Sequence, residues 1–446
     1  MPLRHTTILT VSLCLFLSAS ANAQQIMGRA GITLPTAPAT EQHPVTDDYF
    51  GTKITDLYRW LEDAKSPKTR AFIAAQNAYT KNYLDQVKNR PTIARELDAL
   101  HRVDQTSAPV ERSGGFYFMR RLADENQASL YVRHGWTGKD ERLIDATKLS
   151  ADQNTSIGLS DIAQDGSLLA YDIRQGGADE QEIHFLNLKT GAELADKLPP
   201  ARYNSVSLST AQGGVYYARY EHTGALLYFH KFGSDFTGDK LIFGKEYKGE
   251  KLGEMEQIAG GVTRNGHYLV VYISRGVPAK RQDILLLDLR KPGSEFVPLV
   301  YGIESRFGVH VFGDQLFVET DWKAPNGRIL KATLGTAPEQ WPTIIPESKI
   351  VIESSSLVGG KLFVERLHDV KSETSVYSLT GKLLGTLDYP GIGAADNVYG
   401  NEEARYGFSA FNRSFSHRRS IAMTRSLANV RYLRQPMHPS TPAITS

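Results

Sequence analysis

A turn followed at once by a short apolar strand recurs six times in this chain, and this period limits the folds that the chain can adopt. The turns lie at Gly114, Gly166, Gly213, Asn265, Gly313 and Gly359. Successive turns are 46 to 52 residues apart, and a second turn usually follows each of them by 22 to 28 residues. Four short strands in each repeat of this length are typical of propeller blades. A β-sandwich also contains short strands, but it would not keep one period across six repeats.

The composition of the 446 residues favours strands and gives no sign of nucleic-acid binding. The 18 Phe, 21 Tyr and 4 Trp suit strands better than helices. Lys and Arg number 51 against 49 Asp and Glu, so the whole chain lacks the basic surplus that nucleic acid attracts. The single cysteine, Cys14, falls in a segment that we expect to be removed. A thiol nucleophile, a disulfide and a Cys-ligated metal are therefore not expected.

The first 23 residues have the three parts of a secretory signal peptide. A short basic start at Arg4 and His5 is followed by an apolar stretch over Ile8–Ala19 and a small-x-small cleavage pattern at Ala21–Ala23. This stretch is too short to cross a bilayer, which takes about 20 residues. A buried helix is the alternative, but it would not explain the order of the three parts. We predict an exported protein, periplasmic or secreted, with no membrane segment.

Helical signals are confined to the region before the repeats. Residues 24–42 are rich in Gly, Ala, Thr and Pro and are predicted to form a flexible lead-in. Within residues 43–104, Ser66 followed by proline marks a helix start, because serine caps a helix and proline fits its first position. Pro91 opens a second helix. The sequence therefore predicts a mainly β protein, in which a short α-helical N-terminal segment at 43–104 precedes a seven-bladed β-propeller over 105–411.

The seventh repeat departs from the pattern of the first six. Its first turn is due near residue 405, where Tyr406–Phe411 has the pattern of a strand, but no glycine follows Gly407 in the sequence. The final 43 residues contain seven arginines and no Asp, Glu or Lys. We therefore expect an incomplete seventh blade without outer strands, and an aberrant Arg-rich tail over 412–446. The tail is either translated out of its ancestral frame or a basic arm that binds anionic surfaces.

Short motifs at the start of the chain and inside the repeats form a recognisable set. The most specific ones lie at His43–Val45, Asp47–Gly51, Asp56–Asp63 and Phe72 with Gln76–Asn77. Further matches lie at Ala324–Asn326 with Arg328 and at Leu367–Lys371, with a looser one at Gly166–Tyr171. Together they resemble the prolyl oligopeptidase family of serine peptidases, over about residues 43–411.

The resemblance implies a two-part enzyme. In the family, an N-terminal helical segment packs on a C-terminal α/β-hydrolase domain with a Ser–Asp–His triad, and a seven-bladed propeller caps the active site. The first and last blades are not closed by a shared strand. The family cleaves short peptides after proline, and the propeller admits peptides while excluding folded proteins. Short proline-containing peptides are thus the implied partners.

The catalytic part of the pattern has no counterpart in the sequence. The nucleophile of a hydrolase domain sits in a G-x-S-x-G turn between a strand and a helix, and this chain contains no such motif. The triad therefore has no positions here, no catalytic residue is predicted, and we expect the chain to be inactive alone. A separate hydrolase domain is an expected partner, and self-association through exposed apolar surface is the other expected interaction. The alternatives are a non-catalytic periplasmic propeller that binds peptides or a protein partner, and a decayed gene product.

Other candidate sites have weak signals. The twelve His residues show no H-E-x-x-H and no paired spacing, so neither a metal nor another cofactor is predicted. Gly391–Asp396 lacks the third glycine of a phosphate-binding loop and is predicted to be a loop between blades. Asp47 and Asp48 could form a carboxylate pair, but adjacent acids before an aromatic are more often solvated.

Further candidate residues have structural interpretations beside functional ones. By motif order, Phe185 corresponds to a family strand whose aromatic residue lines the substrate chamber, which makes it a weak substrate-binding candidate. The alternative is an aromatic side chain that packs between blades. We expect structural roles for His184, His368 and the Asn326–Arg328 segment.

Overall fold

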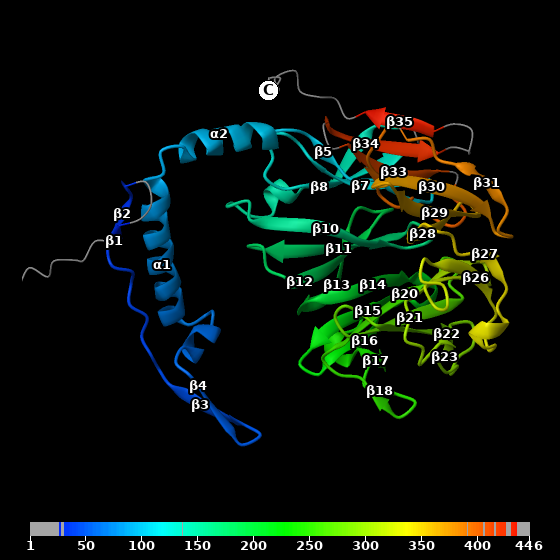
Figure 1. The fold of residues 1–446 in the computed structure, drawn as a ribbon, viewed down its shortest axis with the longest axis horizontal. Helices are drawn as coiled ribbons and strands as arrows, with labels where there is room; N and C mark the ends of the chain where they lie inside the picture. The colour runs from blue at the N-terminus through cyan, green and yellow to red at the C-terminus, as the bar shows by residue number, and fades with distance from the viewer. Residues whose placement is uncertain are drawn as a thin grey trace, which may run out of the picture. The chain divides into compact units, whose positions relative to one another are not determined.

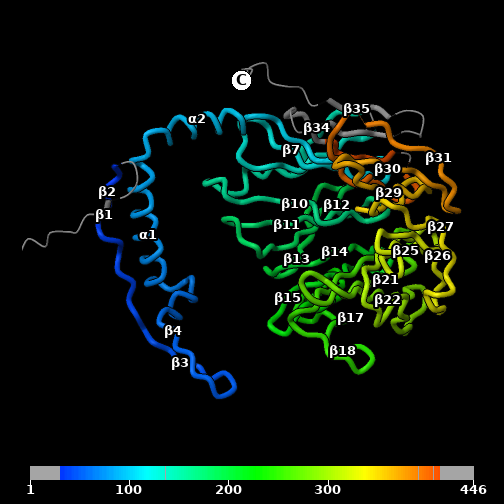
Figure 2. The backbone as a smooth tube through the Cα atoms, in the orientation of Figure 1, coloured from blue at the N-terminus to red at the C-terminus, as the bar shows by residue number. Residues whose placement is uncertain are grey.

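The computed structural model describes residues 26–27, 31–135, 137–389, 391–404, 406–413, 416–424 and 430–434. The chain divides into two compact units, Met1–His101 and Arg102–Ser446. Figure 1 shows the elements of both units as a ribbon, and Figure 2 traces the same backbone as a tube. The predicted signal peptide at 1–23 lies outside the described residues.

The first unit contains two helices and short strands. Its elements are β1 (Ile26–Met27), β2 (Thr33–Leu34), β3 (Val45–Tyr49), β4 (Thr52–Asp56), the 3-10 helix η2 (Arg59–Glu62), α1 (Pro67–Asp85) and α2 (Arg90–His101). The Ser66 side chain accepts a hydrogen bond from the Thr69 backbone N–H at 3.5 Å, and Pro67 occupies the first helical position. The predicted starts of both helices are confirmed. The β3–β4 hairpin was not predicted, because its motif was interpreted only by resemblance.

The first unit buries very little of its own side-chain surface. Among its described residues, only Ile32 and Thr69 are buried. In α2, Ile93, Leu97 and Leu100 share one helical face and are each about half exposed. None of the described helices is both long and apolar enough to cross a membrane. The apolar face of α2 is thus left without a covering layer from its own unit.

The second unit is a series of antiparallel sheets whose strands pair in chain order. The first sheet contains β5 (Gln105–Thr106), β6 (Val110–Arg112), β7 (Gly115–Arg121), β8 (Ser129–His134) and β9 (Asp140–Ile144). The next two contain β10 (Thr155–Ile162), β11 (Leu168–Gln175), β12 (Gln181–Asn187) and β13 (Glu193–Ala201), then β14 (Tyr203–Ser209), β15 (Gly214–Glu221), β16 (Gly224–Lys231) and β17 (Lys240–Phe243). A small hairpin, β18 (Glu246–Tyr247) with β19 (Glu250–Lys251), follows them.

Four more sheets complete the described part of this unit. They contain β20 (Glu256–Val262), β21 (Tyr268–Arg275), β22 (Arg281–Asp288) and β23 (Val297–Val300); β24 (Phe307–Phe312), β25 (Gln315–Thr320), β26 (Arg328–Ala332) and β27 (Thr343–Ile345); β28 (Ile352–Val358), β29 (Lys361–His368), β30 (Lys371–Ser378) and β31 (Leu383–Thr386); and β32 (Ala394–Ala395), β33 (Gly407–Arg413), β34 (Ser416–Thr424) and β35 (Val430–Arg434). Short 3-10 helices lie at Ala146–Lys148, Thr210–Gln212, Phe236–Gly238 and Pro338–Gln340.

The repeat found in the sequence corresponds to these sheets. Each of the six turns connects the innermost strand of a sheet to the next strand; Gly313, for example, joins β24 to β25 with a φ of 58°, a conformation that glycine adopts without strain. Apolar clusters fill the spaces between consecutive sheets. The prediction of a mainly β propeller fold with few helices is confirmed. The number of seven blades stays a prediction.

Contacts between the last sheet and the first close the series into a ring. The ring of Phe408, which is fully buried, meets Phe116 at 6.1 Å between centroids in an edge-to-face arrangement. Asn401 Nδ2 donates to Glu111 Oε2 at 2.6 Å, across 290 positions of sequence. Among the described residues the two sheets share no strand, as the family resemblance implied. In the described part of the chain, side-chain contacts therefore hold the ring closed at this point.

The structure corrects the prediction that the last repeat lacks its outer strands. β34 pairs with β33, and β35 pairs with β34, in antiparallel register. The prediction relied on a missing glycine turn, whereas alternation of apolar residues, such as Ile421 with Met423, is enough to specify an extended strand. The remainder of the tail lies outside the described residues. Its origin in a shifted reading frame stays a prediction.

Replacing Phe408 by alanine should open the ring at its closure point. We expect a loss of about 3–5 kcal/mol in the free energy of unfolding, because the change removes a fully buried aromatic side chain. Urea unfolding of the purified chain measures this loss. Phe236→Ala, at a site 39% exposed, is the matched control and should cost less than about 1 kcal/mol. Equal losses in the two variants would contradict the assignment of the closure.

Candidate functional site

The predicted substrate contact, Phe185, lies in the core between two sheets. It is fully buried on β12, and its ring meets Phe232 edge-to-face at 5.1 Å. Ile183, Leu198 and Tyr217 belong to the same apolar cluster. These contacts favour the alternative interpretation, an aromatic side chain that packs between blades. A substrate-binding role for Phe185 stays a prediction.

Asp47 and Asp48 do not form a carboxylate pair. They are neighbours in strand β3, where successive side chains point to opposite faces. Asp47 pairs with both terminal nitrogens of the Arg59 guanidinium, one of them at 3.0 Å, and this pairing lowers the pKa of Asp47. Asp48 Oδ1 accepts from the Gly51 backbone N–H at 2.7 Å and thereby fixes the hairpin turn. Each carboxylate thus has its own structural partner.

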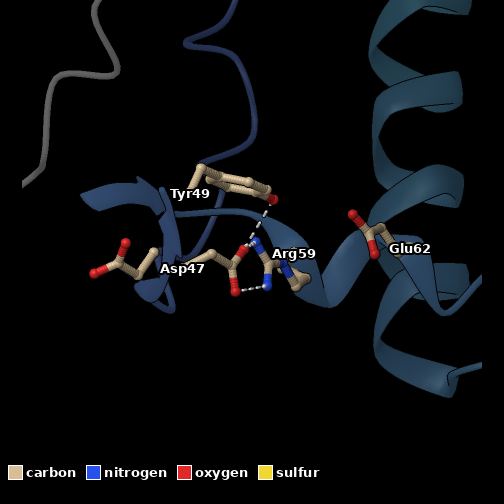
Figure 3. Close-up of a pocket in the computed structure, with 5 residues that line it drawn as sticks. Asp47, Tyr49, Arg59 and Glu62 are labelled. Atoms are coloured by element: carbon tan, nitrogen blue, oxygen red, sulfur yellow. Dashed lines mark hydrogen bonds and ion pairs between the residues drawn. The ribbon is translucent and has the colours of Figure 1, made fainter. Parts of the chain in front are cut away.

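A wide, shallow hollow of about 590 Å³ surrounds this ion pair in the first unit. Figure 3 shows Asp47 and Arg59 joined by hydrogen bonds, with Tyr49 beside them and Glu62 on the neighbouring turn. The pairing also raises the pKa of Arg59, so both groups stay charged over the physiological range. A carboxylate held by an arginine in this way is a poor general base. Asp47 is therefore not a candidate general base in this hollow.

The remaining sequence candidates occupy structural positions. His184 is buried on β12 with its Nε2 2.6 Å from Glu182, and His368 at the end of β29 lies 3.2 Å from Glu373. The Asn326 side chain donates to the Ser348 carbonyl at 2.9 Å, which ties two connecting segments together. The glycine-containing segment that begins at Gly391 connects β31 to β32. Within the described ranges, no three His, Cys, Asp or Glu side chains are grouped so that they could hold a metal ion.

A second hollow, of about 160 Å³, lies where turns from several sheets converge. Its lining residues are Gln164, Thr263, Arg264, Asn265, Val311, Phe312, Gly313, Glu402 and Glu403. They come from the β10–β11 turn, the β20–β21 turn, the end of β24 with its following turn, and the segment before β33. Because these sheets are not all neighbours in the ring, they can meet only near its axis. The hollow is therefore one mouth of the axial region of the propeller.

Arg264 crosses this mouth. Its Nη1 donates to Gln164 Oε1 at 3.4 Å, across 100 positions of sequence, and its Nε lies 3.8 Å from a carboxylate oxygen of Glu403. The Glu403 side chain is 74% exposed, so this ion pair is weak and sensitive to salt. Arg264 thus links the β10–β13 sheet to the β32–β35 sheet by two long contacts.

A second arginine, Arg112, lies near enough to Arg264 for the two charges to interact. Arg112 Nη1 donates to the Glu111 carbonyl at 2.9 Å, and its Nε donates to the Ile162 carbonyl at 3.4 Å. Burial lowers the pKa of Arg112, and the charge of Arg264 lowers it further. Burial also raises the pKa of Asp161, whose carboxylate accepts from the Leu208 backbone N–H at 2.7 Å. The axial region is therefore lined by charged groups that also join neighbouring sheets.

A serine, a histidine and a glutamate meet on three strands of two neighbouring sheets. His310 Nε2 lies 2.8 Å from Ser355 Oγ, and Ser355 Oγ also donates to a carboxylate oxygen of Glu319. In a catalytic triad the acid orients the histidine, whereas here the acid contacts the serine. Burial lowers the pKa of His310 to about 4 and raises that of Glu319. The arrangement joins β24, β25 and β28 and does not activate Ser355 as a nucleophile.

Sequence reasoning did not find the groups at the axis. Arg264 follows the innermost strand β20 and precedes the turn at Asn265, so its place in the repeat was a usable signal. The partners of Arg264 could not be found this way, because they lie in repeats far away in the sequence. Ser355 and His310 carry no motif at all. Their contact depends on the register between neighbouring sheets.

The fold and this axis define a class of protein, namely a β-propeller joined to a separate helical N-terminal unit. A family model described as the prolyl oligopeptidase N-terminal β-propeller domain matches residues 37–413. The chain belongs to this family. The resemblance found in the motifs is confirmed.

Individual relatives agree with this assignment. The prolyl endopeptidase of Elizabethkingia miricola is 31% identical over 390 residues, which cover 84% of this chain and 54% of that protein. The prolyl endopeptidase of Elizabethkingia meningoseptica is 30% identical, with 84% and 53% covered. A solved structure from a study of inter-domain dynamics in two prolyl endopeptidases has a TM-score of 0.79 and 30% identity, covering 90% of this chain and 60% of that one. The chain spans about half the length of the curated relatives it matches.

Protonation of His310 should weaken the interface between the β24–β27 and β28–β31 sheets in acid. A histidine with a lowered pKa in the folded state contributes its full stability above about pH 6.5 and loses it as the pH falls towards 4. The loss is at most about 3 kcal/mol. Urea unfolding at a series of pH values measures this loss. In the wild-type chain the free energy of unfolding should fall between about pH 6.5 and 4, and this fall is called the acid limb. The acid limb should be flatter in His310→Gln.

His368→Gln is the matched control for this pH series, because that side chain is 46% exposed. It should leave the acid limb unchanged. Glu319 contributes in the opposite direction, since a raised carboxyl pKa favours the folded state at low pH and loses this effect as the pH rises. An acid limb of equal steepness in the wild type and His310→Gln would contradict the role given to His310.

Proposed function

We propose that this chain supplies the N-terminal unit and the propeller of a prolyl oligopeptidase-type serine endopeptidase. The observation that carries the proposal is the family match over residues 37–413, together with 31% identity to a prolyl endopeptidase. Short peptides cleaved after proline are the proposed substrates. The chain spans about half the length of its relatives. The activity of the whole enzyme is therefore part of the proposal.

The propeller in this proposal has seven blades and controls access of peptides. The sheets that begin at β5, β10, β14, β20, β24, β28 and β32 are the proposed blades. The mouth of about 160 Å³, crossed by Arg264, is too small for a folded protein. This geometry supports a role in which the ring admits only short, extended peptides.

Hydrolysis in this proposal requires a hydrolase domain that lies outside these 446 residues. The chain contains no G-x-S-x-G turn, and acyl transfer needs a nucleophile, a base and an oxyanion hole in one place. The exposed face of α2, with Ile93, Leu97 and Leu100 about half exposed, is the proposed contact for that domain. We propose that the chain alone is inactive.

Export is the proposed localisation. The basic start, the apolar stretch and the Ala21–Ala23 pattern support a signal peptide of 23 residues and a periplasmic or secreted protein. A second candidate function is a non-catalytic propeller that binds peptides or a protein partner. It is favoured by the ring closure, because contacts such as Phe116 with Phe408 hold the propeller together without a hydrolase domain.

A chimera tests the proposed function directly. Residues 43–411 of this chain would replace the matching segment of the Elizabethkingia miricola prolyl endopeptidase. We expect the chimera to cleave a short chromogenic substrate after proline, with sensitivity to a serine-reactive inhibitor, while the purified 446-residue chain shows no cleavage.

One control and two contrary outcomes accompany the chimera. The same chimera with its G-x-S-x-G serine changed to alanine should lose all cleavage. A folded chimera that binds peptides without cleaving them would instead support the binding module. Proline-specific cleavage by the 446-residue chain itself, blocked by the inhibitor, would refute the proposed inactivity.

Exposed apolar surface in the first unit should bind an environment-sensitive dye such as ANS. We expect dye fluorescence of the purified chain to fall after deletion of residues 24–103, because this removes the exposed faces of α1 and α2. Leu97→Glu in α2 should lower it in part, and Lys81→Glu, on α1 at a site 70% exposed, is the charge-changing control. Unchanged fluorescence in all variants would count against an uncovered apolar face.

A further inference from the structure

Arg366 is a buried arginine without a counter-ion. The residue is 8% exposed, and its Nε is buried with no hydrogen-bond partner. No ion pair or hydrogen bond joins its side chain to another residue in the described part of the chain. A guanidinium nitrogen that is removed from water without a hydrogen-bond partner is costly, because nothing replaces its lost hydration. Such a group is therefore a candidate for binding an anion.

The register of the sheet places the Arg366 side chain. On β29 it alternates with Val364 and Leu362, so the three side chains share one face, and Ile352 lies directly opposite on β28. Ile352, Leu362 and Val364 belong to the apolar cluster between the β24–β27 and β28–β31 sheets. Arg366 thus lies at the edge of this cluster, near the end of β29 that leads into the turn to β30.

The acid that would ordinarily neutralise Arg366 is engaged elsewhere. Glu373 lies directly opposite Arg366 on β30, on the same face of the sheet. Its carboxylate is instead 3.0 Å from Lys371 Nζ and 3.2 Å from His368 Nδ1. The other nearby acid, Asp369, is 91% exposed at the turn and lies 3.8 Å from His368. One face of this hairpin therefore carries three basic side chains, Arg366, Lys371 and His368, around the single carboxylate of Glu373.

We propose that Arg366 anchors an oxyanion-binding site at this end of the β28–β30 strands, with Lys371 as its second cation. A planar guanidinium presents paired N–H donors that match two oxygens of one oxyanion. Lys371 is diagonal to Arg366 across the β29–β30 pair, a position that a long side chain can bridge. The ligand class is a carboxylate or inorganic phosphate, and the two share this recognition chemistry.

Thermal unfolding of the purified 446-residue chain tests the site. Phosphate and acetate would each be added and compared with sodium chloride at equal ionic strength. We expect at least one oxyanion to raise the Tm of the wild type beyond the chloride reference, and neither to do so in Arg366→Met. A response to phosphate alone assigns the ligand to phosphate, and a response to acetate assigns it to a carboxylate group. Equal responses of the wild type and Arg366→Met to both anions would overturn the proposal.

The variant without added oxyanion gives an independent readout. Methionine fills a similar volume without a charge, so Arg366→Met should unfold at the same temperature as the wild type or about 2–4 °C higher. A lower Tm than the wild type would show that the charge is already satisfied and would also overturn the proposal. Arg174→Met is the matched control, since Arg174 is 44% exposed and lies 3.4 Å from Asp172; it should leave the anion response unchanged.

Calorimetry with a variant that keeps the charge gives a separate test. Phosphate and acetate would be titrated into the wild-type chain and into Arg366→Lys, which keeps the charge but loses the paired donors. We expect binding at least 10-fold weaker in the lysine variant. Equal affinity in the two proteins, or heat only at non-saturating molar concentrations of anion, would assign the effect to general ion binding and refute the site.

Discussion

The four-stranded sheets from β10–β13 to β28–β31 carry buried apolar side chains on both faces, and this constraint determines the rest of the structure. In the β14–β17 sheet, for example, Tyr216 packs into the cluster on one side and Tyr217 into the cluster on the other. A row of such sheets would leave an uncovered apolar face at each end. Closing the row into a ring covers both faces, so the contact of Phe116 with Phe408 completes the core of the whole unit.

Around the axis, hydrogen bonds join neighbouring sheets. Arg112 donates to the Ile162 carbonyl, Asp161 accepts from Leu208, and the Ser207 side chain accepts from the Val262 backbone N–H. Buried donors and acceptors must then find partners in neighbouring sheets, which fixes the relative register of the sheets. The same groups give the mouth its charge.

The periodic turns made the propeller predictable, because each turn is local and glycine or asparagine marks it in the sequence. The β34 and β35 strands were missed since the prediction relied on the same marker, and the chain forms these strands without it. Contacts between repeats could not be predicted from one sequence. The pairing of His310 with Ser355 and the lack of a counter-ion at Arg366 both follow from the packing of whole sheets, which no local pattern encodes.

The closure contact between Asn401 and Glu111 spans 290 positions, and this separation has a consequence for biosynthesis. During translation the first sheet emerges with one apolar face uncovered, and its partner is made only after nearly all of the other sheets. The Phe116 side chain must wait for the last strands before it is buried. A nascent propeller of this kind therefore depends on protection of its first sheet until the chain is almost complete.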